Sequence, residues 1–275
     1  MLQISRQDVV AQPFPHVIKQ GILPEALFDR LRADFPGAAT FTNQKSESGT
    51  AGSRTGSGFD IYRGDSGFDA MVQRSTAWRE FSDFINSEAF ADSFRDIFAD
   101  HLDKIGLKID VVQSRINPDY VEPREILSET ATLKDRIDGV ANTLLAPLRT
   151  PKGIELFTRL DIHKSLGGYK KRPHCDRPNR LCSLIVYFTD AAATGLEGGD
   201  LAIFQHKQTK KITSYERHPR ETEVDRVATL SPKPNLGVFF PCQNNSYHGV
   251  SAVTSEGVAR DFLYINISGR KSSLW

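Results

Sequence analysis

The feature that most constrains the fold is a change of sequence pattern near Thr150. Before it, apolar residues recur at helical spacing; after it, short apolar stretches are separated by Gly, Pro and Asn. Such short stretches are typical of the strands of an antiparallel barrel or jelly roll. We therefore expect an α+β fold with a jelly-roll or cupin-like barrel in the C-terminal half. The expected strands are Leu156–Leu166, Leu181–Thr189, Asp200–Phe204, Gly237–Cys242, His248–Val253 and Asp261–Ser268.

Two of these segments alternate in a way that predicts the character of the barrel interior. Residues 260–268 alternate a polar or aromatic face with an apolar face, and residues 182–189 do the same. Side chains two residues apart share a face of a strand, so we expect one polar and one apolar face on each. The polar faces, which should point inward, carry Arg260, Phe262, Tyr264, Asn266 and Ser268, and Ser183, Ile185, Tyr187 and Thr189.

The first half of the chain is expected to be mainly helical. A helix should begin at Pro24, which suits the first turn, and end before Pro36. Residues 77–107 place five large apolar side chains at helical spacing, which predicts a packing face; they are Phe81, Phe84, Ile85, Phe94 and Ile97. A short helix is expected near Ser128–Leu144. We interpret residues 1–275 as one domain in which 1–150 support a barrel formed mostly by 151–275.

Three segments do not fit this packing pattern. Residues 37–58 are rich in Gly, Ser and Thr, and we expect residues 37–66 to form a lid that orders around a ligand. The highly charged residues 206–226 are expected to form a solvated hairpin, with contact to a substrate as the alternative. Gly198 and Gly199 indicate a turn or bulge rather than a phosphate cradle, because no helix is expected after them.

Composition excludes several classes of protein. The 275 residues include 35 basic and 34 acidic ones, a net charge of +1 that provides no basic surface for nucleic acid or membranes. No apolar run approaches the ~20 residues of a membrane helix. The N-terminus lacks the pattern of a secretory signal, and three cysteines are too few for a disulfide scaffold. We expect a reduced, cytoplasmic protein, and the sequence leaves its oligomeric state open.

The strongest indication of chemistry is a possible metal site. His174 and Asp176 are two residues apart, so in an extended strand both side chains can reach one ion. Such a pair arises by chance in roughly one chain of this composition in two. His248, however, follows 72 residues later at the start of another expected strand. Two His and one carboxylate, with open positions left over, form the facial triad of non-haem Fe(II) sites.

Polar residues near the expected barrel mouth are candidates for binding other molecules. Arg260 lies on an otherwise apolar and aromatic strand, where a guanidinium needs an anion. We expect Arg159, His163 and Asn245 to contact a substrate, with pocket lining or a structural pair as the alternative for His163 and Asp161.

Residues 173–269 resemble the double-stranded β-helix core of 2-oxoglutarate/Fe(II)-dependent dioxygenases, in the prolyl-4-hydroxylase-like branch with its small bacterial members. The matching pieces are HCD, RLCSLIVYFTD, EGGDLAIF, LGVFFPCQNNSYHGV and ARDFLYINIS, in that order. Residues 12–36 also resemble the N-terminal entry of many small bacterial members. The resemblance covers about a third of the chain and leaves residues 37–150 unexplained.

The resemblance implies a role for each matching residue. His174, Asp176 and His248 would bind iron, with no further catalytic residue beyond this metal site. Arg260 would pair with the far carboxylate of 2-oxoglutarate and Tyr187 would assist it, and we assign Ser183 to the same cosubstrate site. Related halogenases have a small residue where Asp176 stands, so its carboxylate favours hydroxylation.

The resemblance also implies the reaction: a hydroxylase that consumes Fe(II)-bound 2-oxoglutarate and O₂ and releases succinate and CO₂. Because the chain is compact, we expect a small polar metabolite as substrate, such as an amino acid, nucleotide, sugar or natural-product intermediate. The alternative is a hydroxylase of protein or peptide residues, of prolyl type. The alternative from another class is a non-catalytic, cupin-like metal-binding or sensory protein, against which Arg260 argues.

Overall fold

The computed structural model describes residues 1–41, 58–123, 151–208 and 215–275. Its helices are α1 (Glu25–Ala33), α2 (Ser66–Arg74), α3 (Thr76–Ile85), α4 (Glu88–Phe98) and α6 (Ala191–Thr194). Its strands are β1 (Val17–Gln20), β2 (Gly58–Ile61), β3 (Arg115–Ile116), β4 (Glu155–Ser165), β5 (Lys171–His174), β6 (Arg180–Tyr187), β7 (Leu201–His206), β8 (Val224–Leu230), β9 (Leu236–Pro241), β10 (His248–Val250) and β11 (Arg260–Gly269).

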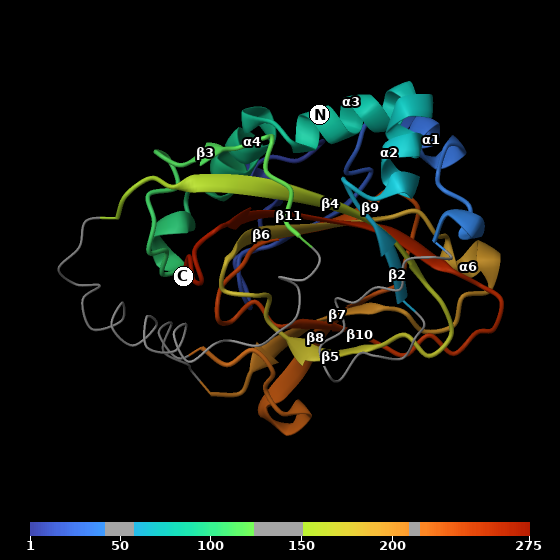
Figure 1. Cartoon of the computed structure of the whole chain (residues 1–275). Coiled ribbons are helices and arrows are strands. Elements are labelled where there is room, and N and C mark those ends of the chain that lie inside the picture. The colour runs from blue at the N-terminus through green and yellow to red at the C-terminus, as the bar shows by residue number, and fades with distance from the viewer. Residues whose placement is uncertain (42–57, 124–150, 209–214) are drawn as a thin grey trace.

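The strands form two layers. The larger sheet has the order β1-β9-β6-β11-β4-β2, with β3 added beside β4, and the smaller sheet has the order β5-β10-β7-β8. The two sheets face each other, and helices α1 to α4 lie over the outer face of the larger one (Figure 1). The expected α+β fold with a double-stranded β-helix core and helical support is thus confirmed.

The helices bury the apolar face that the alternation predicted. Leu263, Ile265 and Ile267 of β11 are fully buried in one continuous hydrophobic core. Aromatic rings connect this sheet to the helices: Phe239 of β9 lies 5.2 Å, between ring centroids, from Phe98 of α4. Burial of each such side chain contributes about 2–3 kcal/mol. Because the apolar face is held outward, the polar face of β11 must point between the sheets.

Most expected elements are present within a few residues of their predicted ends. The helical region at 77–107 is divided into α3, α4 and a 3-10 turn at Leu102–Lys104. Strands β2, β3, β5 and β8 were not among the expected strands. Strand β8 lies partly in the segment expected to be a solvated hairpin, and six of its seven residues are exposed or only half-buried. Only Val224 of this strand is buried, so β8 lacks the buried apolar face by which a strand is recognised.

Parts of three predictions lie outside the described residues. These are residues 42–57 of the expected lid, the expected helix at Ser128–Leu144, and residues 209–214 of the charged insertion. The described end of the lid segment is built into the fold, since β2 pairs with β4 from Gly58 to Ile61. In the described part of the chain, no helix is both long and apolar enough to cross a membrane.

Candidate active site

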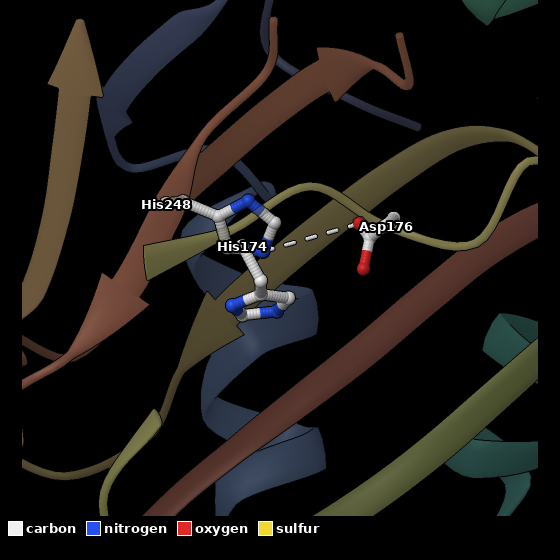
Figure 2. Close-up of side chains that lie close together, drawn as sticks. All are labelled: His174, Asp176 and His248. Atoms are coloured by element: carbon white, nitrogen blue, oxygen red, sulfur yellow. Dashed lines mark ion pairs between the residues drawn. The ribbon is translucent and has the colours of Figure 1, made fainter. Parts of the chain in front are cut away.

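The three predicted metal ligands lie together between the two sheets. His174 ends β5, Asp176 follows it by two residues, and His248 begins β10. Antiparallel pairing sets His174 directly opposite His248, with ring centroids 4.4 Å apart. The Asp176 carboxylate lies 3.9 Å from His248 Nε2, as the dashed line in Figure 2 marks. All three offer ligand atoms within 4.8 Å of one another, and all three residues are buried.

Backbone contacts fix the orientation of both imidazole rings. His174 Nδ1 lies 2.9 Å from the carbonyl oxygen of Arg172, and His248 Nδ1 lies 3.0 Å from that of Ser246. A carbonyl can only accept, so Nδ1 of each ring donates and Nε2 keeps its lone pair. Hydrogen bonds of this kind orient the histidine ligands of metal ions and set their tautomer.

The protonation states also suit a metal ion. Burial, together with the neighbouring His248, lowers the pKa of His174 well below its usual value, and burial lowers the pKa of His248. Burial alone would raise the pKa of Asp176, but His248, Arg180 and His174 outweigh it and lower it. At neutral pH the site therefore holds two neutral imidazoles and one carboxylate, the forms that bind metal. Two His and one carboxylate fit Fe(II).

Side chains of the larger sheet hold the Asp176 carboxylate. Ser183 donates a hydrogen bond of 2.7 Å to one oxygen, and Tyr264 donates one of 3.0 Å to the other. Arg180 donates to the Tyr264 hydroxyl and lies 3.9 Å from the same carboxylate. Ser183, which we assigned to the cosubstrate, thus contacts a predicted metal ligand. Tyr264 and Arg180 received no such role from the sequence, although Tyr264 lies on the predicted inward face of β11.

One terminal nitrogen of Arg260 has no hydrogen-bond acceptor among the described residues. It is 1% exposed, its Nε donates to the Gly199 carbonyl at 2.7 Å, and one terminal nitrogen donates to the Tyr187 hydroxyl at 2.8 Å. Its other terminal nitrogen is buried and has no acceptor among the described residues. An unsatisfied buried donor costs about 1–3 kcal/mol, and more when it is charged. The far carboxylate of 2-oxoglutarate would satisfy this donor, so the residues present fit the cosubstrate.

Gly199 makes the close approach to Arg260 possible. Its backbone has a φ of +72°, and a Cβ at this position would lie 2.9 Å from Cδ of Arg260. Glycine adopts such a φ without strain, and its missing side chain leaves room for the guanidinium. Gly198 and Gly199, where a turn or bulge was expected, both have positive φ values, and Gly198 lies in a bend.

Arg159, by contrast, is fully engaged within the protein. Its guanidinium contacts three carboxylates: Asp161 at 2.5 Å, Glu122 at 3.3 Å and Asp60 at 3.5 Å. Burial would raise the pKa of Asp161, but Arg159 and His163 outweigh it and lower it to about 2. Arg159 and His163 both line the cavity between the sheets, whereas Asn245 is not among its described lining residues.

One cavity joins all these groups. His174, Asp176 and His248 line it together with Arg260, Arg159 and Tyr264. Three further arginines that the sequence gave no reason to group also line it: Arg177, Arg180 and Arg217. Arg217 lies in the charged segment 206–226, for which contact with a substrate was the alternative interpretation.

Comparison with known proteins agrees with this geometry. Residues 160–267 match the model of the 2OG-Fe(II) oxygenase superfamily. That segment holds all three predicted metal ligands and Arg260. Among curated proteins, none matches the chain in sequence.

Solved structures similar to this chain include three prolyl hydroxylases. A Pseudomonas putida prolyl-4-hydroxylase is 13% identical, with a TM-score of 0.48, covering 93% of this chain and 92% of its own. One from Phytophthora capsici is 13% identical, with a TM-score of 0.46, covering 94% and 60%. A Trichoplax adhaerens enzyme in complex with a hypoxia inducible factor peptide fragment is 10% identical, with a TM-score of 0.45, covering 94% and 84%. The chain thus spans less than two thirds of the Phytophthora protein.

Proposed function

We propose that this chain, whose residues 160–267 match the model of the 2OG-Fe(II) oxygenase superfamily, is an oxygenase of that kind and hydroxylates a small polar metabolite. Its reaction uses Fe(II), 2-oxoglutarate and O₂. The observation that carries the proposal is a single cavity with three parts: the His-Asp-His cluster, the open donor of Arg260, and further charged lining. Concave sites with a few convergent polar groups are typical of small-molecule binding.

In this proposal His174, Asp176 and His248 hold Fe(II), and Arg260 holds the far carboxylate of 2-oxoglutarate. When bound, Fe(II) and 2-oxoglutarate with O₂ supply the oxidising chemistry for a C–H bond, and succinate and CO₂ are the co-products. Tyr187 keeps Arg260 in place through the hydrogen bond at 2.8 Å. Ser183 and Tyr264 hold both oxygens of Asp176, so this carboxylate stays ionised and oriented.

The register of the larger sheet orders these groups along the cavity. Arg260 lies at one end of β11, and Asn266, six residues on, pairs with Arg159 of β4. At ~3.3 Å per residue, the two arginines are separated by roughly 20 Å along the sheet. Tyr264, which contacts Asp176, lies between them. The cosubstrate therefore occupies the Arg260 end, and the substrate enters from the Arg159 end.

Succinate release from 2-oxoglutarate tests the proposal. The Fe(II)-loaded protein is incubated with panels of amino acids, nucleotides, sugars and natural-product intermediates, and in parallel with proline-containing peptides. A small metabolite that stimulates succinate formation and gains one oxygen by mass supports the proposal. Stimulation by the peptides alone would replace it with a prolyl-type hydroxylase. If the metal-loaded protein does not bind 2-oxoglutarate, the alternative of a non-catalytic metal-binding protein replaces the proposal.

A further inference from the structure

Lys171 is the lysine among the described residues that line the active-site cavity. It lines the cavity together with Arg260 and His248, and its side chain is partly buried. No hydrogen bond or ion pair of its ammonium group is found among the described residues, whereas Arg159 contacts three carboxylates. An ammonium group has three donors and no acceptor, so Lys171 can bind an anion within the cavity.

An irregularity in the strand pairing turns Lys171 towards the cavity. His174 of β5 pairs with His248 of β10, and Lys171 pairs with Val250. Between the two pairs β5 advances by three residues and β10 by two, so β5 contains one extra residue, as in a β-bulge. His248 and Val250 share a face of the sheet because they are two residues apart, and residues paired across strands share that face too. Lys171 therefore lies on the same face as His174, although three positions separate them.

Lys171 also lies on the Arg260 side of the paired histidines. Val250 pairs with Leu201 of β7, so Lys171, Val250 and Leu201 form one row across the smaller sheet, and all three line the cavity. Gly199, two residues before Leu201, accepts a hydrogen bond from Arg260. The row is thus next to the part of the cavity in which Arg260 has its open donor.

The far carboxylate of 2-oxoglutarate needs more donors than Arg260 has left. Hydrogen bonds to Gly199 and Tyr187 use its Nε and one terminal nitrogen, which leaves one terminal nitrogen for a ligand. A carboxylate has two oxygens, and burial of a charged group is costly unless its partners are complete. From this arrangement, and resting on the proposed function, we infer that Lys171 binds the far carboxylate of 2-oxoglutarate together with Arg260.

The two cations come from facing sheets. Lys171 belongs to β5 of the smaller sheet, and Arg260 belongs to β11 of the larger one. Each supplies a charge-assisted hydrogen bond, the stronger kind, to a carboxylate. Lys171 thereby makes the site more selective for a dicarboxylate over an oxo acid with one carboxylate.

Binding of two matched ligands to the Mn(II)-loaded protein tests this inference. 2-Oxoglutarate is compared with 2-oxovalerate, which has the same carbon chain but a methyl group in place of the far carboxylate. Mn(II) replaces Fe(II) so that no turnover occurs, and calorimetry measures both Kd values. Lys171→Met should weaken 2-oxoglutarate about 10-fold, from loss of one charge-assisted contact, and leave the Kd of 2-oxovalerate unchanged. A merely structural role of Lys171 would weaken both ligands alike.

Two further variants locate the effect. Lys170→Met is the matched control, because Lys170 is exposed and is not among the described lining residues of this cavity. It should leave both Kd values unchanged. Lys171→Arg keeps the positive charge and should retain most of the affinity for 2-oxoglutarate. Circular dichroism checks that all three variants fold like the wild type.

The outcomes separate this inference from the proposed function. An unchanged Kd for 2-oxoglutarate in Lys171→Met, an equal loss for both ligands, or an equal loss in Lys170→Met overturns the role of Lys171. Each of these results leaves the proposed function intact, since the wild type still binds 2-oxoglutarate. If the Mn(II)-loaded wild type does not bind 2-oxoglutarate, the proposed function fails first.

Discussion

Arg260 and Arg159 are buried to a similar degree at opposite ends of one cavity, yet their surroundings differ. Arg159 contacts three carboxylates and also packs against the Tyr62 ring, with its guanidinium carbon 3.9 Å from the ring centroid. Arg260 donates to one carbonyl and one hydroxyl, and no carboxylate forms an ion pair with it among the described residues. Arg159, whose charge is paired with carboxylates of the protein, therefore stabilises the fold. Arg260 has no such carboxylate, so we expect it to bind the carboxylate of a ligand.

We expect the largest effect when the ion pairs of Arg159 are removed. Arg159→Leu removes the partner of three buried carboxylates and should reduce the free energy of unfolding by about 3–5 kcal/mol. Urea unfolding followed by circular dichroism measures this loss. Arg226→Leu, an exposed arginine on β8, should change it by less than about 0.5 kcal/mol. Equal losses in both variants would show that the Arg159 cluster contributes no special stability.

The same substitution at Arg260 should weaken the binding of 2-oxoglutarate more than it lowers the stability of the fold. Arg260→Leu should raise the Kd for 2-oxoglutarate on the order of 100-fold, from loss of a charge-assisted pair of ~2–3 kcal/mol. Calorimetry on the Mn(II)-loaded protein measures it, with Arg260→Lys as the variant that keeps the charge and part of the affinity. An unchanged Kd would mean that another arginine, Arg180 or Arg159, binds the far carboxylate of 2-oxoglutarate.

The carboxylates around Arg159 should make the stability of the protein depend on pH in the acid range. The pKa of Asp161 is about 2 in the folded protein, below its ordinary value of 3.8, so its stabilising effect is present above pH 3.8. That contribution, about 2 kcal/mol, is lost as the pH falls from 3.8 towards 2. Unfolding free energies measured from pH 5 to 2 should fall more steeply for the wild type than for Asp161→Asn. Parallel curves would contradict the low pKa.

The smallest effect concerns the residue that supports Arg260. Tyr187→Phe removes the hydroxyl that accepts from Arg260 at 2.8 Å and keeps the ring. One hydrogen bond to a charged group contributes ~1–1.5 kcal/mol here, so the Kd for 2-oxoglutarate should rise about 5- to 10-fold. Tyr120→Phe, which packs on Phe157 away from Arg260, is the control. No difference between the two variants would mean that Gly199 alone positions Arg260.

The sequence indicates the direction in which Arg260 and Arg159 point, but it does not indicate their partners. Both lie on strands whose polar residues point inward, and alternation reveals that direction. It does not reveal partners: Asp60 and Glu122 reach Arg159 from segments distant in the chain, and only the folded structure brings them together. Arg159 was therefore interpreted as a substrate contact, whereas the structure shows its nitrogens engaged with carboxylates.

The metal cluster was accessible to sequence reasoning because its geometry is local. His174 and Asp176 share a face through their spacing, and His248 begins a strand that turn residues mark. Four strands of the structure, β2, β3, β5 and β8, were not among the expected strands. Strands β2, β3 and β5 have only two to four residues each, and β8 is largely exposed. The sequence did not indicate that Arg177, Arg180 and Arg217 line one cavity, because Arg217 lies about 40 residues further along the chain, in a segment whose carbonyl accepts a hydrogen bond from the Cys175 amide.

The metal content of the protein tests the central claim most directly. Wild type, His174→Ala and His248→Ala are dialysed anaerobically against Fe(II), and bound iron per chain is measured together with the circular dichroism spectrum. We predict one iron per wild-type chain and almost none in either variant, with spectra unchanged. Undiminished iron in both variants would contradict the assignment of His174, Asp176 and His248 as the iron site.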